Sequence, residues 1–483
     1  MSQPSVTITE LDGALGILPA SAGRLLAVVG VSSKGPVDQP ATYARITGLR
    51  GDFGDGPMVE AAAHFIERYG RPVVVVRTGQ AVTGDYGAID DSGVTGTSTV
   101  TATPASEPID DYEVVVQVLT GGTVGSAGIT YRWSLDGGRT WSPETALGTD
   151  TELAIPGSGV SFDLDTGDLE DGDTWSVVTT APQWDDTELD AALDALADTA
   201  VRWETVHAVG PIDADAFDAL ELAISGLQAR GKYHSWIGST RMPAPGESEA
   251  TYLASLSSAL GNKASVHGML CAGACRLTSS VTGRKQRRPA SFPIAARQAS
   301  VSEEINIADV NLGTLQGVSI RDAHGNPDEH DESVSPGLDD ARFTVLRTWD
   351  DFAGVYANRP RVFSAEGSDF RLMPHRRVLN LAHEALRAFF IRRLNRPVLV
   401  DKATGFILES EATEIESGAK AAMRAVLMAK PKASAVEFVL SRTDNLLSTS
   451  TMTGSARVTP MAYPEFIELE VGFLNPALQV QAV

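Results

Sequence analysis

A buried strand, a helix and a second buried strand follow one another near the start of the chain. Residues 24–31 (RLLAVVGV) and 72–77 (PVVVVR) are apolar runs without alternation, which is typical of strands buried on both faces. Between them, residues 58–69 gather apolar side chains on one helical face, and Gly70 fits the end of that helix. Because a connection of this kind joins parallel strands, the chain should contain an α/β domain built on a parallel sheet.

The composition changes at about residue 81. From there to residue 184, glycine, threonine, serine and aspartate dominate, and short alternating runs such as 113–120 and 174–180 are separated by turn residues. No helical period is present in this stretch, so it is typical of an all-β module of the sandwich type. Helical patterning returns with residues 186–200. The β module should therefore be inserted into the α/β domain.

Helical and strand patterns alternate again in the rest of the chain. Helices are predicted over 214–230, 374–394 and 412–428, residues 280–345 are the least regular part, and 464–473 (PEFIELEVGF) resembles a strand. We expect a multidomain α/β protein with an α/β core near both chain ends, an inserted all-β, sandwich-like domain and extended strand arms at the N- and C-termini. The expected parts are an N-terminal arm (1–20), an α/β domain (21–80 and 186–370), an inserted acidic all-β domain (81–185), a C-terminal α/β domain (371–472) and a C-terminal arm (473–483).

Most of the negative charge lies in the inserted segment. The whole chain of 483 residues has a net charge of −23, and residues 81–186 contain 19 acidic residues against two arginines. Such a surface would repel phosphates, so nucleic acid is not an expected partner. The basic stretch 284–289 (RKQRRP) is therefore interpreted as an interface loop to a neighbouring subunit rather than as a nucleic-acid site.

Several other protein classes are disfavoured by the sequence. No apolar run is long enough for a membrane-spanning helix, and the first residues lack the basic start and apolar core of a secretory signal. Cys271 and Cys275 lie in an apolar run and are expected to be small buried residues rather than a metal or redox pair. No phosphate-binding G-x-x-x-x-G-K-[ST] loop is present, and residues 51–56 (GDFGDG) are interpreted as a turn.

The order of several weak motifs resembles that of the tail sheath proteins of contractile phages, R-type pyocins and related contractile injection systems. The motifs are Val29-Gly30-Val31, Gly35-Pro36, Pro40, Phe53-Gly54, Gly70-Arg71-Pro72 with a strand ending at Arg77, Asp369-Phe370-Arg371, Arg376-Arg377-Val378 and Pro464-Glu465-Phe466-Ile467. They cover about half of the chain. The acidic β module departs from the minimal family pattern and resembles the outward decorations of many sheaths.

The resemblance implies a structural protein without enzymatic activity, cofactor or metal. Sheath subunits form stacked hexameric rings around a tail tube, and they contract to drive the tube through a cell envelope. The implied partners are further copies of the chain, the tube protein, and baseplate and terminator proteins, without nucleic acid and without membrane insertion. The implied location is the virion tail sheath, assembled in the cytoplasm of the host bacterium.

Two alternating segments at the chain ends are candidates for contacts between subunits. A polymer of one subunit needs heterologous contacts, and an extended arm can add a strand to the sheet edge of a neighbour. Residues 5–11 and 477–483 alternate apolar and polar side chains, so Val6, Ile8, Leu478 and Val480 would set the register. The alternative is that these residues are frayed termini.

A cationic cluster in the C-terminal part is the candidate tube-facing surface. Lys420 and Arg424 lie one helical turn apart, and Lys430 and Lys432 follow closely. We expect this helix to meet acidic groups on the tube through salt-sensitive ion pairs. The alternative is an ordinary solvated helix face.

One motif points to a different class of protein. Residues 134–141 (SLDGGRTW) match the Asp-box of sialidase-type propellers, with Ser134, Asp136, Gly138 and Trp141 at the motif positions. In propellers this motif braces a tight turn away from the catalytic centre. Only one copy occurs, and the module has two arginines, Arg132 and Arg139, where a sialidase needs a cluster. The motif is therefore interpreted as a turn, and the alternative is a carbohydrate-binding or sialidase-like protein.

Histidines and acids near residue 330 permit weak cation binding. The candidates are Asp322, His324, Asp328, His330, Asp331 and Glu332. A solvated loop is favoured over a metal site. His64 and His383 lie in helical segments, where packing or surface placement is the expected role.

Overall fold

The computed structural model describes residues 25–322, 324 and 326–473. Packing divides the chain into two units, with the boundary between Arg396 and Pro397. The predicted arm residues Val6, Ile8, Leu478 and Val480 lie outside the described residues. Within the described residues, no helix is both long and apolar enough to cross a membrane.

The first unit is built on a six-stranded sheet. The sequence predicts that its first strands are parallel, and they are. Strand β1 pairs in parallel with β3 on one side and with β15 on the other. The order across the sheet is β17 (Gly268–Cys271), β16 (Ser235–Ser239), β15 (Trp203–Pro211), β1 (Leu25–Gly30), β3 (Val73–Arg77) and β2 (Ala41–Tyr43). Only the edge strand β2 runs antiparallel to its neighbour.

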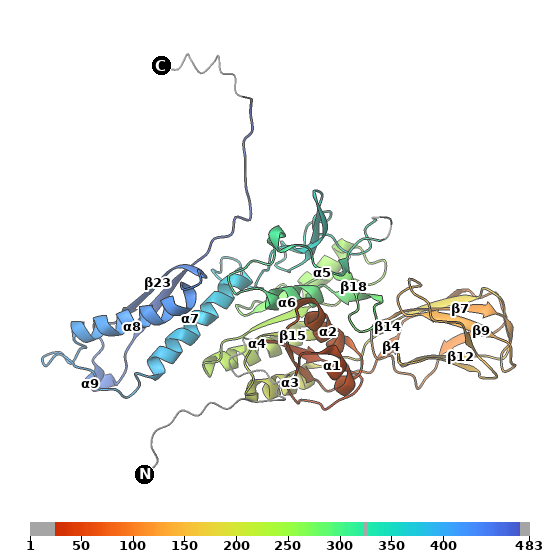
Figure 1. The fold of residues 1–483 in the computed structure, drawn as a ribbon, viewed down its shortest axis with the longest axis horizontal. Helices are drawn as coiled ribbons and strands as arrows, with labels where there is room; N and C mark the ends of the chain where they lie inside the picture. Colours follow the sequence, from red (N-terminus) through yellow and green to blue (C-terminus); the bar gives the residue numbers. More distant parts are fainter. Residues whose placement is uncertain (1–24, 323, 325, 474–483) are drawn as a thin grey trace, which may run out of the picture. The chain divides into compact units, whose positions relative to one another are not determined.

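Helices cover both faces of this sheet (Figure 1). Alternate residues of β1 face opposite sides, with Ala27 and Val29 in one hydrophobic cluster and Leu26 and Val28 in the other. The first cluster includes side chains of α3 (Asp186–Asp198), α4 (Ala214–Ala229) and α5 (Glu249–Leu260). The second includes side chains of α1 (Ile46–Phe53), α2 (Pro57–Tyr69) and α6 (Ser291–Ser300).

The strand order reverses direction at β1. The chain moves from β1 through α2 to β3 on one side, and later returns through α3 to β15 on the other side. In open α/β sheets, the crevice at the carboxyl ends of such strands is the usual place for a site. The inserted module leaves the core after β3, so it starts from this same edge.

The inserted segment folds around its own hydrophobic cluster, which includes Val116, Phe162 and Trp175. Strand β7 buries every second residue, as expected for a strand with one face toward a core. One sheet has the order β10-β9-β7-β14-β4, with β5 also beside β14, and a second has the order β11-β12-β6. The strands are β4 (Asp85–Tyr86), β5 (Asp90–Gly93), β6 (Val100–Ala102), β7 (Glu113–Thr120), β8 (Gly122–Thr123), β9 (Thr130–Ser134), β10 (Thr145–Ala146), β11 (Glu152–Ile155), β12 (Val160–Leu164), β13 (Asp168–Leu169) and β14 (Thr174–Thr180).

Residues 280–345 contain more regular structure than the sequence indicates. Helix α6 has almost no polar face, because eight of its ten residues are buried, so the usual amphipathic signal is missing. The prediction of a loop over 284–289 is also wrong, because Lys285–Pro289 form strand β19. A contact of this stretch with a neighbouring subunit stays a prediction. Strand β18 (Ala274–Thr278) comes just before this region, and the elements in and after it are β19, α6, a short 3-10 helix (Val310–Leu312), β20 (Val318–Ser319), β21 (Leu346–Trp349), β22 (Phe352–Ala357) and α7 (Met373–Ile391).

Unit 2 consists of one long helix and a β-hairpin. The predicted helices over 374–394 and 412–428 are confirmed as α7 and α8. Helix α7 packs with unit 1, whereas the sequence analysis assigns it to the C-terminal domain that begins at residue 371. The elements of unit 2 are α8 (Glu409–Leu427), β23 (Ala433–Leu440), α9 (Leu446–Thr449) and β24 (Gly454–Pro460). Residues 464–473, predicted as a strand, are in no strand of the described chain, because no described strand pairs with them.

Candidate functional site at the junction of the β module and the core

The Asp-box residues form a compact turn at the end of β9. The Asp136 carboxylate accepts hydrogen bonds from the Ser134 hydroxyl (2.7 Å) and from the backbone N–H and hydroxyl of Thr140 (both 2.8 Å). Gly138 has a φ of 81°, which favours glycine, and its N–H donates to the Ser134 oxygen at 2.9 Å. The Asp136 carboxylate and the Ser134 hydroxyl therefore both form hydrogen bonds within the turn. The last motif residue, Trp141, packs against Arg132, whose guanidinium lies 4.4 Å from the centre of the Trp141 ring.

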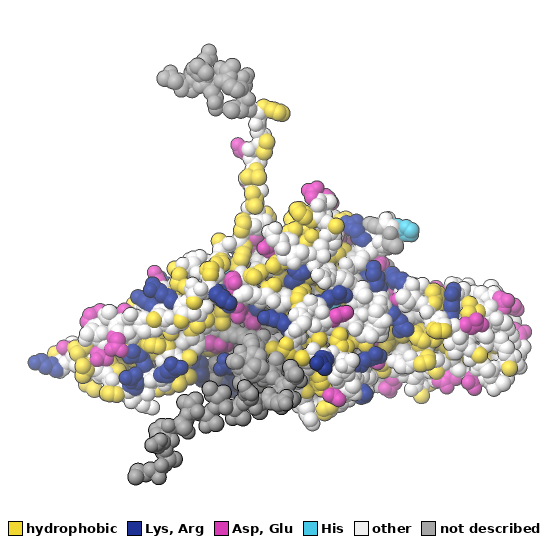
Figure 2. All heavy atoms as spheres, viewed as in Figure 1, with side chains coloured by type: hydrophobic (Ala, Val, Ile, Leu, Met, Phe, Trp, Pro, Cys, Tyr) yellow, Lys and Arg dark blue, Asp and Glu magenta, His cyan; other side chains and the backbone are white. Residues whose placement is uncertain are grey.

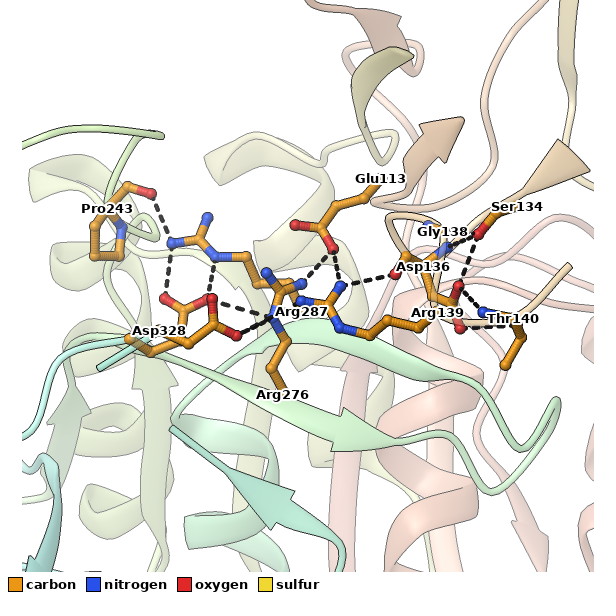
Figure 3. A network of polar contacts seen from close by, with 11 residues as sticks. Glu113, Ser134, Asp136, Gly138, Arg139, Thr140, Pro243, Arg276, Arg287 and Asp328 are labelled. Carbon is orange, nitrogen blue, oxygen red and sulfur yellow. Dashed lines mark hydrogen bonds and ion pairs between the residues drawn. The ribbon is translucent and has the colours of Figure 1, made fainter. Parts of the chain in front are cut away.

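This turn directs Arg139 out of the module toward the core (Figure 3). Arg139 Nη1 donates to the Asp136 carbonyl at 2.7 Å and to Glu113 at 3.2 Å. Its Nη2 lies 3.7 Å from a carboxylate oxygen of Asp328, which belongs to the segment after β20. The motif therefore places a cation at the boundary between the module and the core.

Arginines of the core continue this network of alternating charges (Figure 3). Arg276 of β18 pairs with Glu113 of the module, and its Nε lies 2.9 Å from Asp328. Although burial opposes its charge, the hydrogen bonds and charges of these two acids raise the pKa of Arg276. Arg287 of β19 donates to Glu329 at 2.6 Å and 3.0 Å and to the Pro243 carbonyl at 2.9 Å. These cations are committed to partners within the chain.

A groove of about 670 Å³ lies beside this network. It follows the carboxyl ends of the sheet strands, where Val31, Gly210 and Thr240 line it, and it extends to Glu113 and Leu135 of the module. Trp184, on the segment returning from the module, donates its indole N–H to the Val209 carbonyl at 2.7 Å. The insertion therefore occupies the edge of the sheet where α/β proteins usually hold a ligand.

The candidate metal residues do not converge. His330 contacts Glu249 through Nδ1 (3.0 Å) and Glu332 through Nε2 (2.9 Å), whereas Asp331 pairs with Arg321 (3.0 Å). Because both ring nitrogens contact carboxylates, the pKa of His330 is raised even though burial lowers it. The predicted solvated loop is wrong for 329–332, which are buried, and the described residues contain no cluster able to hold a metal ion.

The cationic residues predicted to face the tube lie on and just after α8. Arg424 and Lys430 are exposed and Lys420 is partly exposed, while Ala419, Met423 and Leu427 form the buried side of the helix. A surface position is compatible with the predicted contact to a tube, and the contact itself stays a prediction.

Buried titratable groups elsewhere have packing roles. Cys271 and Cys275 are fully buried, and burial raises the pKa of both thiols. His64 is buried, and burial together with the charge of Arg68 lowers its pKa to about 4. The pKa of His383 is lowered, chiefly by burial.

The sequence does not identify the residues that join the module to the core. Arg276, Arg287 and Arg288 are far along the chain from Asp110 and Glu113. The sequence shows only that these arginines are clustered in a chain with more acidic than basic residues, and this does not identify the acids that they contact.

The family described as DUF2586, N-terminal domain, matches residues 3–361 of the chain. No curated protein is significantly similar to the chain in sequence.

Solved structures of contractile assemblies have similar chains. A chain of the PVC sheath complex of an extracellular contractile injection system, in the contracted state, has a TM-score of 0.53 at 11% identity over 99% of each chain. A chain of the anti-feeding prophage (AFP) baseplate has a TM-score of 0.51 at 11% identity, covering 98% of this chain and 100% of that one. The sheath tail protein of Listeria innocua has a TM-score of 0.45 at 14% identity, covering 91% of this chain and 96% of that one. The fold is therefore that of the chain in the PVC sheath complex over nearly its whole length.

Proposed function

The chain belongs to the family described as DUF2586, N-terminal domain, and on this basis and on its fold we propose that it is the sheath subunit of a contractile tail. The observation that carries the proposal is the likeness to the chain of the PVC sheath complex, which covers 99% of both chains and leaves no large part of either unmatched. Copies of the chain form stacked hexameric rings around a tail tube. The sheath shortens to drive the tube through the target envelope, and it meets baseplate and terminator proteins at its ends.

The exposed segment before the C-terminus supports assembly by strand exchange. Ile467, Leu469, Val471 and Phe473 alternate with polar residues or glycine, and their side chains are 71% to 110% exposed. An extended segment of this pattern gains stability only by adding its apolar face and backbone to another sheet. We include it in the C-terminal arm with Leu478 and Val480, and the N-terminal arm carries Val6 and Ile8.

Unit 2 offers a receiving edge for such arms. Among the residues that the structure describes, its β23 and β24 form a two-stranded sheet, and a sheet of this size is marginally stable by itself. Helix α8 packs on this hairpin through Ala419, Met423 and Leu427 and leaves Val439 of β23 56% exposed. Arms from neighbouring subunits complete the sheet and keep subunits connected while their bodies rotate.

Electron microscopy of purified protein tests the proposal. The full chain should form tubes or rings, and deletion of 464–483 or of 1–20 should give folded monomers, verified by circular dichroism and size-exclusion chromatography. Polymers that form equally well after both deletions contradict the role of the arms. Monomers of the full chain, also in the presence of its tube protein, contradict the sheath function.

A further inference from the structure

The hairpin of β21 and β22 presents two aromatic side chains to solvent at its tip. Trp349 and Phe352 are paired across the two strands, so their side chains lie on the same face of the hairpin. They are 41% and 53% exposed. The two turn residues between them, Asp350 and Asp351, are also exposed, and neither forms an ion pair within the described part of the chain. The tip therefore combines an apolar surface with two unpaired carboxylates.

The base of this hairpin is fixed in the core. Leu346 and Val355 are buried, and the Val355 carbonyl accepts the backbone N–H of Leu315 at 2.8 Å. Nearer the tip, the Arg347 guanidinium lies 3.7 Å from the centre of the Trp349 ring, and this cation–π contact orients the indole. Aromatic side chains held in place before binding are typical anchors of protein contacts, because little entropy is lost when they dock.

A hollow of about 380 Å³ lies between the end of α4 and the second half of α7, and we call it the α4–α7 hollow. Tyr233, Leu386 and Phe390 give it apolar walls, and Arg230 and Arg387 also line it. Both arginines are exposed, and neither forms an ion pair among the residues that the structure describes. The hollow is therefore an apolar surface beside two unpaired guanidinium groups, which is the complement of the hairpin tip.

Buried polar groups beside the hollow add to its preference for carboxylates. Arg376 donates to the side chain of Gln228, which lines the hollow, at 3.1 Å, and its buried Nε has no hydrogen-bond partner in the described chain. His383 also lines the hollow, and its Nδ1 is buried without a partner there. Burial lowers the pKa of Arg376 to about 10, so this arginine keeps its charge at neutral pH. An occupant that brings negative charge is therefore favoured.

We propose that the tip of the β21–β22 hairpin of one copy docks in the α4–α7 hollow of a second copy. The rings of Trp349 and Phe352 cover the apolar walls, and the two aspartates of the turn pair with Arg230 and Arg387. Because the two surfaces differ, the contact is heterologous and can repeat from copy to copy. The inference rests on the proposed function, since it identifies a contact between neighbouring sheath subunits that does not involve the arms.

Cross-linking between two singly substituted full-length chains tests the contact. Ala353→Cys lies beside the tip and Ala229→Cys lines the hollow; both positions are exposed, and the natural Cys271 and Cys275 are buried. A short bismaleimide added to a mixture of the two variants should give dimers that contain one chain of each, visible on a denaturing gel. Ala44→Cys, an exposed position outside both surfaces, should give no such dimers when it replaces Ala229→Cys.

Charge reversal tests the pairing of the two surfaces. Asp350→Lys with Asp351→Lys in the chain that carries the tip cysteine should lower the cross-linking yield about tenfold, because like charges replace opposite charges. Arg230→Glu with Arg387→Glu in the other chain should have the same effect, and the two reversals together should restore the yield.

Matched variants separate this contact from general effects of charge and hydrophobicity. Asp90→Lys with Asp91→Lys, an exposed acidic pair of the β module, should leave the yield unchanged. Trp349→Ser removes the aromatic anchor and should lower the yield about tenfold. Leu222→Ser, at a position on α4 that is 71% exposed, should have no effect.

The inference is overturned by dimers of the Ala353→Cys chain alone, by equal yields with Ala44→Cys, or by a yield that the charge reversals do not change. Electron microscopy of the same mixtures keeps this result apart from the proposed function. Tubes or rings that form without the cross-link contradict the docking contact and not the sheath function. Cross-linked chains that form no tubes or rings contradict the sheath function and not the contact.

Discussion

Arg288 and Asp110 form a two-point ion pair across the boundary between core and module, 178 positions apart in the sequence. The pair is almost completely excluded from water. It therefore depends on both partners being present, because a lone buried charge is far more unfavourable than the pair.

Removal of one partner should destabilise the protein strongly. Arg288→Ala leaves buried acids without their cation, and breaking a buried pair in this way costs about 3–5 kcal/mol. Denaturant unfolding at pH 7 measures the loss. The control is Arg50→Ala, which breaks the half-exposed pair with Asp55 and should cost less than about 1 kcal/mol. Equal losses for the two variants would contradict the assignment.

The Asp-box turn should be needed for the stability of the module. Asp136→Ala removes the acceptor for three hydrogen bonds and leaves the buried Ser134 hydroxyl without this partner, so we expect a loss of about 1–3 kcal/mol. Calorimetry should detect the earlier unfolding of the module. Asp150→Ala, at an exposed turn of the same module, should leave its transition within about 0.5 kcal/mol.

The close approach of β16 and β17 should exclude any side chain at position 268. A Cβ there would lie 2.0 Å from the Trp236 ring, so Gly268→Ala should cost about 1–3 kcal/mol. Gly51→Ala is the matched control, since its Cβ would meet no atom within 4 Å, and alanine favours the helix by about 0.5–1 kcal/mol. Thermal unfolding of both variants checks the expected opposite signs.

Acid should destabilise the fold through His64. Its folded pKa is about 4, below the value of about 6.5 in the unfolded chain, so the unfolded state binds more protons between these values and stability falls as the pH is lowered. His64→Leu should remove this contribution to the pH dependence, which amounts to about 1.6 kcal/mol between pH 6.5 and pH 5. Urea unfolding at the two pH values provides the measurement. A pH dependence that is unchanged in the variant would show that His64 is not the group responsible.

Charge reversal on α8 tests the proposed tube contact. Lys420→Glu with Arg424→Glu should prevent assembly on isolated tubes while arm-dependent contacts between subunits persist, since only the ion pairs to the tube are inverted. Lys402→Glu, an exposed cation outside α8, is the control. Sedimentation of sheath with tubes at low and high salt gives the readout, and normal assembly of the double variant would refute the contact.

Local patterns were sufficient for much of the fold. The parallel pair β1 and β3, helix α2 and the long helices α7 and α8 follow from periodicity and stop signals within a few residues of each element. Helix α6 and strand β19 were not predicted, because α6 buries eight of its ten residues and β19 (Lys-Gln-Arg-Arg-Pro) has no alternating apolar residues. Residues distant in the sequence bury these two elements, so the local pattern of apolar residues does not predict them.

In the candidate site too, local sequence predicts some features and contacts between distant segments decide the others. The sequence alone determined the Asp-box turn, because its spacing places Ser134, Asp136 and Thr140 within reach of one another in any chain that makes this turn. Only the tertiary structure decided that the turn directs Arg139 toward the core, and that Arg288 meets Asp110. A turn depends on residues a few positions apart, whereas the partner of a buried charge depends on which distant segments the fold brings together.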